Sequence, residues 1–285
     1  MIIKKKSRVL IITFLDLRLK FNNFIIFVLH ELRRQNMPRF KYESKDVYYK
    51  IYGNGKPLLL LHGNTASSKM FKSLLKNYTK KYKVILIDFP GHGKSSRLKE
   101  FKTDFWFYNS QVCYSLIKKL NIEKTAVIGT SGGALVGINL ALEHPECVSH
   151  LIADSFEGEY PLKSYIDTVE LDREQSKRKF IVKLFWFINH GFGWKKIVDL
   201  DTKMLLKFNS TGKAFFHKPI SELVVPSLLI GSRQDEFCDH LDKIYTGLQN
   251  KNPNLKIHLF ETGGHPAMLS NSKDFFNLVT RFIKE

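Results

Sequence analysis

Short, continuously apolar runs alternate with longer segments of helical spacing over residues 37–285. Such runs are typical of strands that are buried on both faces. They are found, after a first strand at Val47–Tyr52, at Leu58–Leu61, Val84–Ile87, Thr125–Ile128, Val148–Ala153, Pro226–Ile230 and Leu255–Phe260. Segments with apolar residues at helical spacing are Ser67–Tyr82, Phe105–Leu120, Gly132–Glu143 and Ser272–Lys284. Strands that alternate with helices predict an α/β fold whose mostly parallel central sheet is flanked by helices.

This alternation stops between residues 156 and 222. The segment contains charged and aromatic helical material but no convincing buried strand. It predicts a helical cap inserted into a core made of residues 37–155 and 223–285. Within the cap, Phe185, Trp186 and Phe187 are consecutive, so at helical spacing they cannot all face one core. Two interpretations remain for this stretch, namely contact with substrate and packing between cap and sheet.

Residues 1–36 do not follow the pattern of the rest. They hold eight Lys and Arg residues against two acids, and so carry a net charge of 8 − 2 = +6. The apolar runs Val9–Leu15 and Phe24–Leu29 are far shorter than the roughly 18 residues that suggest a spanning helix. A signal peptide is not favoured, because no small-residue cleavage site follows the apolar stretch. The extension is expected either to lie on a membrane surface or to be poorly structured, with Met37 as the natural start; the second interpretation is favoured.

Composition and charge narrow the classes of partner. With 44% hydrophobic and 25% charged residues, the chain is expected to fold around a large core. The formal net charge is +18, but the basic residues are dispersed along amphipathic segments, as at Lys118, Lys119 and Lys124. This dispersal is typical of solvated helix faces, so no nucleic-acid partner is expected. Three cysteines without a C-x-x-C pair favour a reducing, cytoplasmic location and argue against zinc.

The sharpest motif is G-x-S-x-G, formed by residues 129–133. It lies between a predicted buried strand and a predicted helix, which is the context of a nucleophile elbow with Ser131 as the nucleophile. Gly129 and Gly133 flank the serine because a turn this sharp leaves no room for side chains. The helix that begins after Ser131 directs backbone N–H groups and a positive dipole end toward a developing oxyanion.

A serine nucleophile needs a base, and a base of this kind is expected after the last strand. His265 lies in the glycine-rich loop that directly follows Leu255–Phe260. The carboxylate that orients such a base is expected between the serine and the histidine in chain order, and Asp235 follows the strand Pro226–Ile230. Glu236 and Asp154 remain alternatives.

The loop after Leu58–Leu61 is expected to supply an oxyanion donor. Gly63 allows close approach of the backbone there, and the N–H of Asn64 is the natural donor, together with the N–H of Gly132. No P-loop and no G-x-G-x-x-G pattern is present, so the sequence predicts neither a cofactor nor a metal.

With these residues in place, the chain resembles the α/β-hydrolase superfamily over residues 37–285. The resemblance rests on the blocks LLLLHGN, VILIDFPGHGKSS, VIGTSGGA, PSLLIGSRQDEF and GGHPAML, in that order. It implies a structural role for the loop of Asp88, Gly91, His92 and Gly93. Haloalkane dehalogenases and epoxide hydrolases have a similar early block but use an aspartate at the elbow, where this chain has Ser131.

The expected function is hydrolysis of a small-molecule carboxylic ester or thioester through Ser131, His265 and Asp235, with an acyl-enzyme intermediate. Hydrolysis of a carbon–carbon bond in a diketone-like acid is the alternative on the same residues. A non-catalytic, ligand-binding member of the fold is the alternative from another class. The pattern leaves the substrate and the oligomeric state open.

Overall fold

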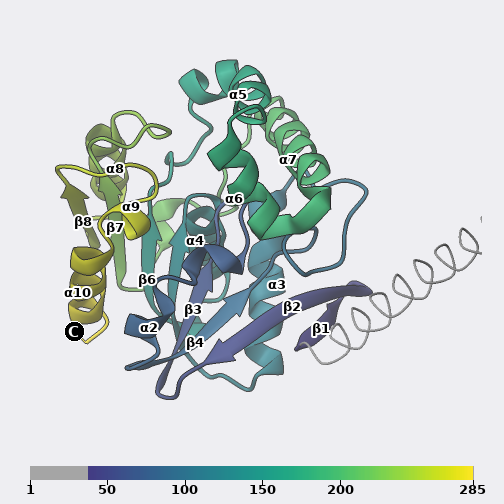
Figure 1. Ribbon diagram of the computed structural model, residues 1–285. Coiled ribbons are helices and arrows are strands. Elements are labelled where there is room, and N and C mark those ends of the chain that lie inside the picture. The colour runs from purple at the N-terminus through teal and green to yellow at the C-terminus, as the bar shows by residue number, and fades with distance from the viewer. Residues whose placement is uncertain (1–37, 285) are drawn as a thin grey trace, which may run out of the picture. The chain divides into compact units, whose positions relative to one another are not determined.

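The computed structural model describes residues 38–284, which contain one eight-stranded sheet. The strand order is β1-β2-β4-β3-β5-β6-β7-β8 (Figure 1). Their bounds are β1 Arg39–Tyr42, β2 Lys45–Tyr52, β3 Lys56–Leu61, β4 Tyr82–Ile87, β5 Thr125–Thr130, β6 Val148–Asp154, β7 Ser227–Ser232 and β8 Leu255–Phe260. Strand β2 pairs with β4 in antiparallel register, and every pair from β4 to β8 is parallel. The predicted α/β fold with a mostly parallel sheet is confirmed.

Helices cover both faces of this sheet, and a separate apolar cluster lies on each. Alternate residues of β3 show the division, because Leu59 and Leu61 enter one cluster whereas Leu58 and Leu60 enter the other. The first cluster includes residues of α3 (Phe105–Lys119), α4 (Gly132–Glu143) and α8 (Leu241–Lys251). The second includes residues of α2 (Leu75–Tyr78), α9 (Ala267–Ser270) and α10 (Ser272–Phe282). Both faces are therefore buried, as the continuous apolar runs predict.

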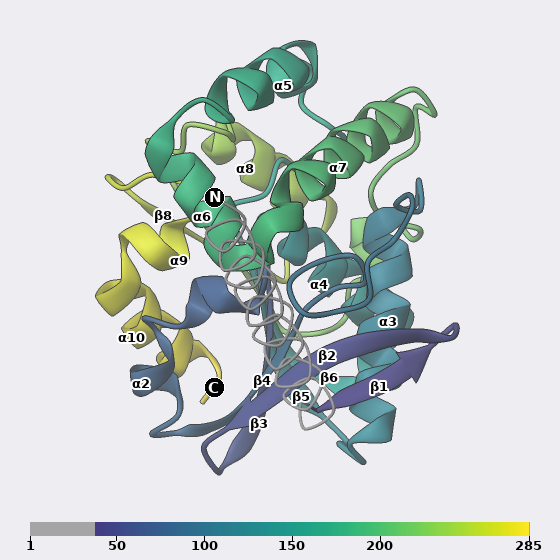
Figure 2. The same ribbon diagram turned by 45° about the vertical axis from the view of Figure 1, so that its right-hand side comes forward.

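Between β6 and β7 the chain leaves the sheet and forms three helices. These are α5 (Lys163–Ser176), α6 (Phe180–His190) and α7 (Trp194–Asn209), with the short turns η3 (Gly191–Gly193) and η4 (Ile220–Glu222). Figures 1 and 2 show α5, α6 and α7 together beyond one end of the sheet. They occupy the stretch for which the sequence predicts helices and no strand. Their action as a cap over the site, and the domain bounds given above, stay predictions.

Helix and strand bounds differ from the sequence-based expectation mainly at Ser67–Tyr82. One helix was expected there, but the structure has a 3-10 turn, η1 (Ser68–Phe71), followed by the four-residue α2. The reason is that Tyr82 already pairs with Lys56 of β3, so the chain must be extended at that point. Strand β1 and helix α8 are additional elements.

No helix among residues 38–284 has both the length and the hydrophobicity needed to cross a membrane. The interpretations of residues 1–36 concern a segment outside the described range.

Candidate active site

Ser131 is the single residue between β5 and α4. Residues other than glycine rarely adopt its backbone conformation. Its φ is 55° and its ψ is −129°. The Ser131 N–H donates to the Asp154 carbonyl oxygen at the end of the neighbouring β6, at 2.7 Å. A strained residue held at the carboxyl end of a central strand is the geometry expected of a nucleophile elbow.

The glycines around Ser131 are required by backbone contacts. A Cβ added to Gly129 would lie 2.1 Å from Gly133 O, and one added to Gly133 would lie 2.3 Å from Leu61 O. A Cβ at Gly63 would lie 2.9 Å from the Cβ of Ser131. The backbones of the elbow and of the loop after β3 are therefore in close contact. This supports the sequence-based expectation that glycines occur here because side chains would not fit.

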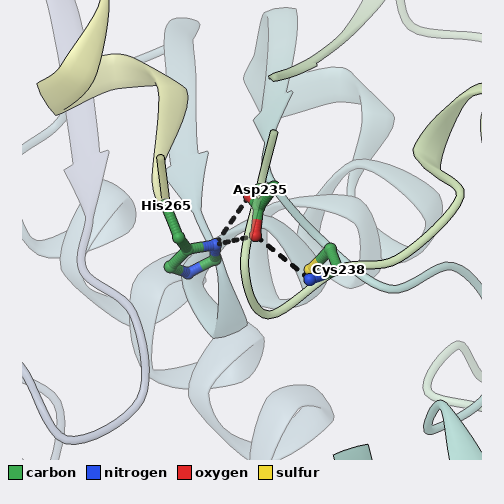
Figure 3. Close-up of side chains that lie close together, drawn as sticks. All are labelled: Asp235, Cys238 and His265. Carbon is green, nitrogen blue, oxygen red and sulfur yellow. Dashed lines mark hydrogen bonds and ion pairs between the residues drawn. The ribbon is translucent and has the colours of Figure 1, made fainter. Parts of the chain in front are cut away.

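Asp235 and His265 are joined directly (Figure 3). His265 Nδ1 lies 2.9 Å from Asp235 Oδ2 and 3.1 Å from Oδ1. Asp235 Oδ1 also accepts hydrogen bonds from the N–H groups of Phe237 and Cys238, so the turn after β7 fixes the carboxylate. With Nδ1–H donating to Asp235, Nε2 of His265 is left to accept a proton.

The two groups change each other's pKa. Burial lowers the pKa of His265, but the hydrogen bond to Asp235 and the charges of Asp235, Asp154 and Glu236 outweigh it, so the pKa is raised. Burial raises the pKa of Asp235, but the hydrogen bond and charge of His265, with two backbone N–H donors, hold it below its usual value. This is the pattern of a carboxylate that stabilises an imidazolium.

The two alternative acids make other contacts. Asp154 is fully buried and accepts hydrogen bonds from Thr130 Oγ1, Ser155 Oγ and the N–H of Met268. Burial raises its pKa to about 6. The carboxylate of Glu236 accepts from the backbone N–H of His265, at 2.8 Å, and not from the ring. Asp154 thus links the end of β5 to α9, which begins just after His265, and Glu236 binds the backbone of His265 itself.

Among the described residues, Ser131 Oγ forms no hydrogen bond with His265. Both residues are partly exposed, and both follow strands of the same sheet, β5 and β8. The structure thus brings Asp235 and His265 into contact and links both the Ser131 backbone and the His265 loop to Asp154.

Asn64 and Gly132, the predicted oxyanion donors, are adjacent. A Cβ added to Gly132 would lie 1.9 Å from Asn64 Oδ1 and 3.1 Å from Trp106 Nε1. Both of these side-chain atoms are buried without a hydrogen-bond partner within residues 38–284. Unpaired buried polar atoms beside the elbow suit a site that is completed by a ligand.

The sequence did not single out three charged residues that approach this region. Glu157 follows β6. Burial raises the pKa of its carboxyl, the charge of His265 lowers it, and the charge of Asp235 raises it. Arg173 of α5 pairs with the fully buried Asp201 of α7, with Nη1 2.6 Å from Oδ2. In the sequence these residues stand among other charges at helical spacing, so no local signal separated them from solvated positions.

His62 and His92 are buried beneath the loops rather than free to react. His62 Nε2 accepts from the N–H of Phe89 at 3.0 Å, while Nδ1 lies 2.9 Å from Gly63 O. Burial lowers the pKa of both histidines. His92 stacks on Phe101, with ring centroids 4.9 Å apart. These contacts agree with the structural role that the resemblance implied for the His92 loop.

One group of side chains has the spacing of a metal site within the described residues. The ligand atoms of Asp235, Cys238 and His265 lie within 4.8 Å of one another. Burial raises the pKa of the Cys238 thiol well above its usual value, however, so the thiolate that a metal would bind is disfavoured. The hydrogen bonds of Asp235 account for the cluster without an ion.

The sequence is similar to known proteins of the same fold. Residues 56–180 match a family model described as alpha/beta hydrolase fold. A pimeloyl-(acyl-carrier protein) methyl ester esterase of Legionella pneumophila is 26% identical over 84% of this chain and 100% of its own length. A 2-hydroxy-6-oxo-6-phenylhexa-2,4-dienoate hydrolase of Comamonas testosteroni is 22% identical, over 90% of this chain and 99% of that protein.

Solved structures show the same likeness. A meta-cleavage product hydrolase from Pseudomonas fluorescens superimposes with a TM-score of 0.69 at 19% identity, covering 87% of this chain and 97% of that one. The sheet order, the matched family model and this solved structure show the α/β-hydrolase fold, and the family model with the esterase and hydrolase relatives supports a hydrolytic enzyme.

Proposed function

We propose that this chain is a serine hydrolase that cleaves a carboxylic ester or thioester of a small molecule. The observation that carries the proposal is the hydrogen bond between His265 Nδ1 and Asp235, at 2.9 Å, on a sheet that also holds Ser131 at a strained strand–helix turn. It also draws support from the relative named as a methyl ester esterase, which this chain covers over its full length.

In the first half of the proposed reaction, His265 Nε2 takes the proton of Ser131 Oγ as that oxygen attacks the carbonyl carbon. The resulting imidazolium is stabilised by Asp235, whose pKa is held low. The N–H groups of Asn64 and Gly132 stabilise the oxyanion, and the N-terminus of α4 adds its dipole. His265 then gives its proton to the leaving alcohol or thiol, and Ser131 is acylated.

In the second half, a water molecule enters and His265 removes its proton. The hydroxide formed attacks the acyl carbon, and the oxyanion again lies at Asn64 and Gly132. Collapse releases the carboxylic acid, and the proton returns from His265 to Ser131 Oγ. Each half uses His265 once as base and once as acid, which requires a pKa that permits both forms near neutrality.

A second candidate is hydrolysis of a carbon–carbon bond in a diketone-like acid. It is favoured by the Comamonas relative, which is similar over nearly the whole of both chains. The same serine, histidine and aspartate would act, and the leaving group would be a carbon acid rather than an alcohol or thiol.

Labelling with a fluorophosphonate tests the nucleophile. The wild-type chain is expected to be labelled, Ser131→Ala is expected to lose the label, and Ser164→Ala, an exposed serine on α5, is expected to keep it. Loss of ester turnover in Ser131→Ala by several orders of magnitude is expected in parallel. Undiminished labelling or turnover of Ser131→Ala would overturn the assignment.

A substrate panel then separates the two candidates. Methyl esters and thioesters of acids of increasing chain length are compared with a vinylogous diketone acid by kcat/KM. Highest kcat/KM on an ester or thioester supports the first candidate, and highest kcat/KM on the diketone acid supports the second.

A further inference from the structure

The buried side chains of helix α6 are Trp186, Asn189 and His190, and two of the three are polar. Asn189 Oδ1 accepts from the Ser67 N–H at 2.9 Å, and the Gly93 N–H donates to His190 Nδ1 at 3.1 Å. Trp186, which is also buried, donates through Nε1 to Thr65 Oγ1. A helix on the surface of a soluble domain ordinarily turns its apolar stripe to the core, but most apolar side chains of α6 are exposed.

The apolar side of α6 consequently faces outward. Its side chains and that of the following turn are exposed by between 41% and 95%: Phe180, Ile181, Leu184, Phe187, Ile188 and Phe192. Most are large, and Phe187 and Phe192 touch each other edge to face. Large apolar side chains that are exposed together on one helix, rather than scattered singly, mark an interaction site.

Positive charge borders this surface, and negative charge is absent from it. The chain from Gln175 to Val198 contains six Lys and Arg residues and no Asp or Glu. They are Lys177, Arg178, Lys179, Lys183, Lys195 and Lys196. Lys177 is paired with Glu174 and Asp199, and within the described residues the other five form no ion pair. The face is therefore apolar with a cationic border.

A lysine-lined hollow adjoins the same helix. It has a volume of about 140 Å³, and Lys50, Lys69, Lys72 and Lys94 line it against a single carboxylate, that of Asp88. Asp88 is buried and already accepts from backbone N–H groups. Lys69 joins the hollow to the helix, because its Nζ donates to the carbonyl oxygen of Ile188 at 2.6 Å. A phosphate is the kind of anion that such a group of ammonium ions attracts.

We propose that α6 and this hollow dock the protein on an anionic phospholipid bilayer. The six outward apolar side chains enter the boundary between headgroups and acyl chains, and the bordering Lys and Arg side chains extend to the headgroups. The hollow takes a headgroup phosphate.

The pattern of charge favours a bilayer over a second copy of this chain, whose identical face would bring like charges together. It also favours a bilayer over the N-terminal extension, because residues 1–36 carry a net charge of +6 and would be repelled. A protein partner would in addition need hydrogen-bonding groups across the face, and outward positions 180, 181, 184, 187 and 188 offer none.

Flotation of the full chain with vesicles tests the proposal. The wild-type chain is expected to float with vesicles of phosphatidylcholine that contain 30% phosphatidylglycerol. With vesicles of phosphatidylcholine alone, little of the chain is expected to float. The double variants Ile181→Ser/Phe192→Ser and Lys50→Gln/Lys72→Gln are each expected to lower the bound fraction at least fivefold. Val224→Ser, at an apolar position 75% exposed outside the face, is the matched control and is expected to float as the wild type does.

Three results would overturn the proposal. The first is equal flotation of the wild type and Ile181→Ser/Phe192→Ser, which would assign binding to another segment, such as residues 1–36. The second is equal flotation on neutral and anionic vesicles. The third is a wild-type dimer by light scattering that Ile181→Ser/Phe192→Ser converts to monomer, since a second copy would then cover the face. Far-ultraviolet circular dichroism of every variant verifies the fold.

Discussion

The carboxyl edge of the sheet and the helices inserted between β6 and β7 are packed in different ways. At the edge, backbone presses on backbone: a Cβ added to Gly129 or Gly133 would lie 2.1 or 2.3 Å from a carbonyl oxygen. In the inserted segment, a Cβ added to Gly191 or Gly212 would meet no atom within 4 Å. The position of Ser131 is thus fixed by close backbone contacts, whereas the insertion has space for a side chain at Gly191 and Gly212.

Side chains, not backbone, hold the inserted helices together. Arg173 and Asp201 pair between α5 and α7, and Trp186 stacks on Trp194 between α6 and α7, with ring centroids 5.3 Å apart. Contacts of this kind change whenever one of the side chains is replaced, whereas the backbone contacts at the edge are disturbed only where a glycine gains a side chain. The difference suggests that the proposed chemistry depends on the sheet edge and that substrate choice and docking depend on the insertion.

The largest effect is expected at the edge, from Asp235→Asn. Asp235 Oδ1 accepts from two backbone N–H groups, so the asparagine is expected to keep its oxygen there and to place its NH2 group in the position of Oδ2. His265 Nδ1 then faces a donor instead of a charged acceptor, and kcat is expected to fall by on the order of 10³-fold or more. Steady-state ester hydrolysis measures it. Glu236→Gln, which touches only the backbone N–H of His265, is expected to cost less than about tenfold. A larger loss in Asp154→Asn than in Asp235→Asn would reassign the acid.

Gly133→Ala tests the backbone contact itself. The added methyl group must displace Leu61 O, and a shift of about 1 Å at Ser131 is expected to lower kcat/KM by roughly 10²-fold. The free energy of unfolding is expected to drop by about 1–3 kcal/mol. In the insertion, Gly193→Ala is the control, because its Cβ would meet only Arg97 Nε, at 3.9 Å. Equal losses of unfolding free energy in the two variants, measured by urea unfolding, would contradict the difference between the sheet edge and the insertion.

The pH dependence of kcat/KM reports the coupling of His265 to Asp235. His265 must be neutral to act as base, so activity is expected to rise with pH as the ring loses its proton. Because the pKa of His265 is raised, the midpoint is expected above the ordinary value of 6.5. In Asp235→Asn the charge and the hydrogen bond of Asp235, which raise the pKa of His265 most, are lost while burial remains, so the midpoint of the residual activity should move to lower pH. A midpoint that stays in place would show that Asp235 does not set it.

The smallest effect is expected in the insertion, from Trp186→Phe. The ring stack on Trp194 is kept and the hydrogen bond from Nε1 to Thr65 is lost. The expected cost is about 1 kcal/mol of unfolding free energy and a less than threefold change in kcat/KM. Thermal unfolding and esters of two chain lengths measure both. A strong change in chain-length preference would instead place Trp186 against the substrate, as one of the sequence-based interpretations had it.

Much of the fold and of the candidate site could be predicted from local sequence. Strand β8 and helix α4 have the predicted bounds, Leu255–Phe260 and Gly132–Glu143. The reason is that a doubly covered parallel sheet requires unbroken apolar runs, and a strand–helix turn around a serine requires flanking glycines. Those demands act on neighbouring residues, so they are visible without a structure.

What only the tertiary structure decided concerns residues that are distant in the chain. Asp154 ends β6, and Asp235 and Glu236 follow β7. Only the placement of the loop after β8 shows which of these carboxylates lies beside the His265 ring. The Arg173–Asp201 pair joins two helices whose charges look like solvated positions in the sequence. Helix α6 reads as an apolar helix with a core to cover, yet its hydrogen bonds to Ser67 and Gly93 turn that side outward. Burial and partner depend on contacts between distant segments, and hydrophobic periodicity, which is local, cannot supply them.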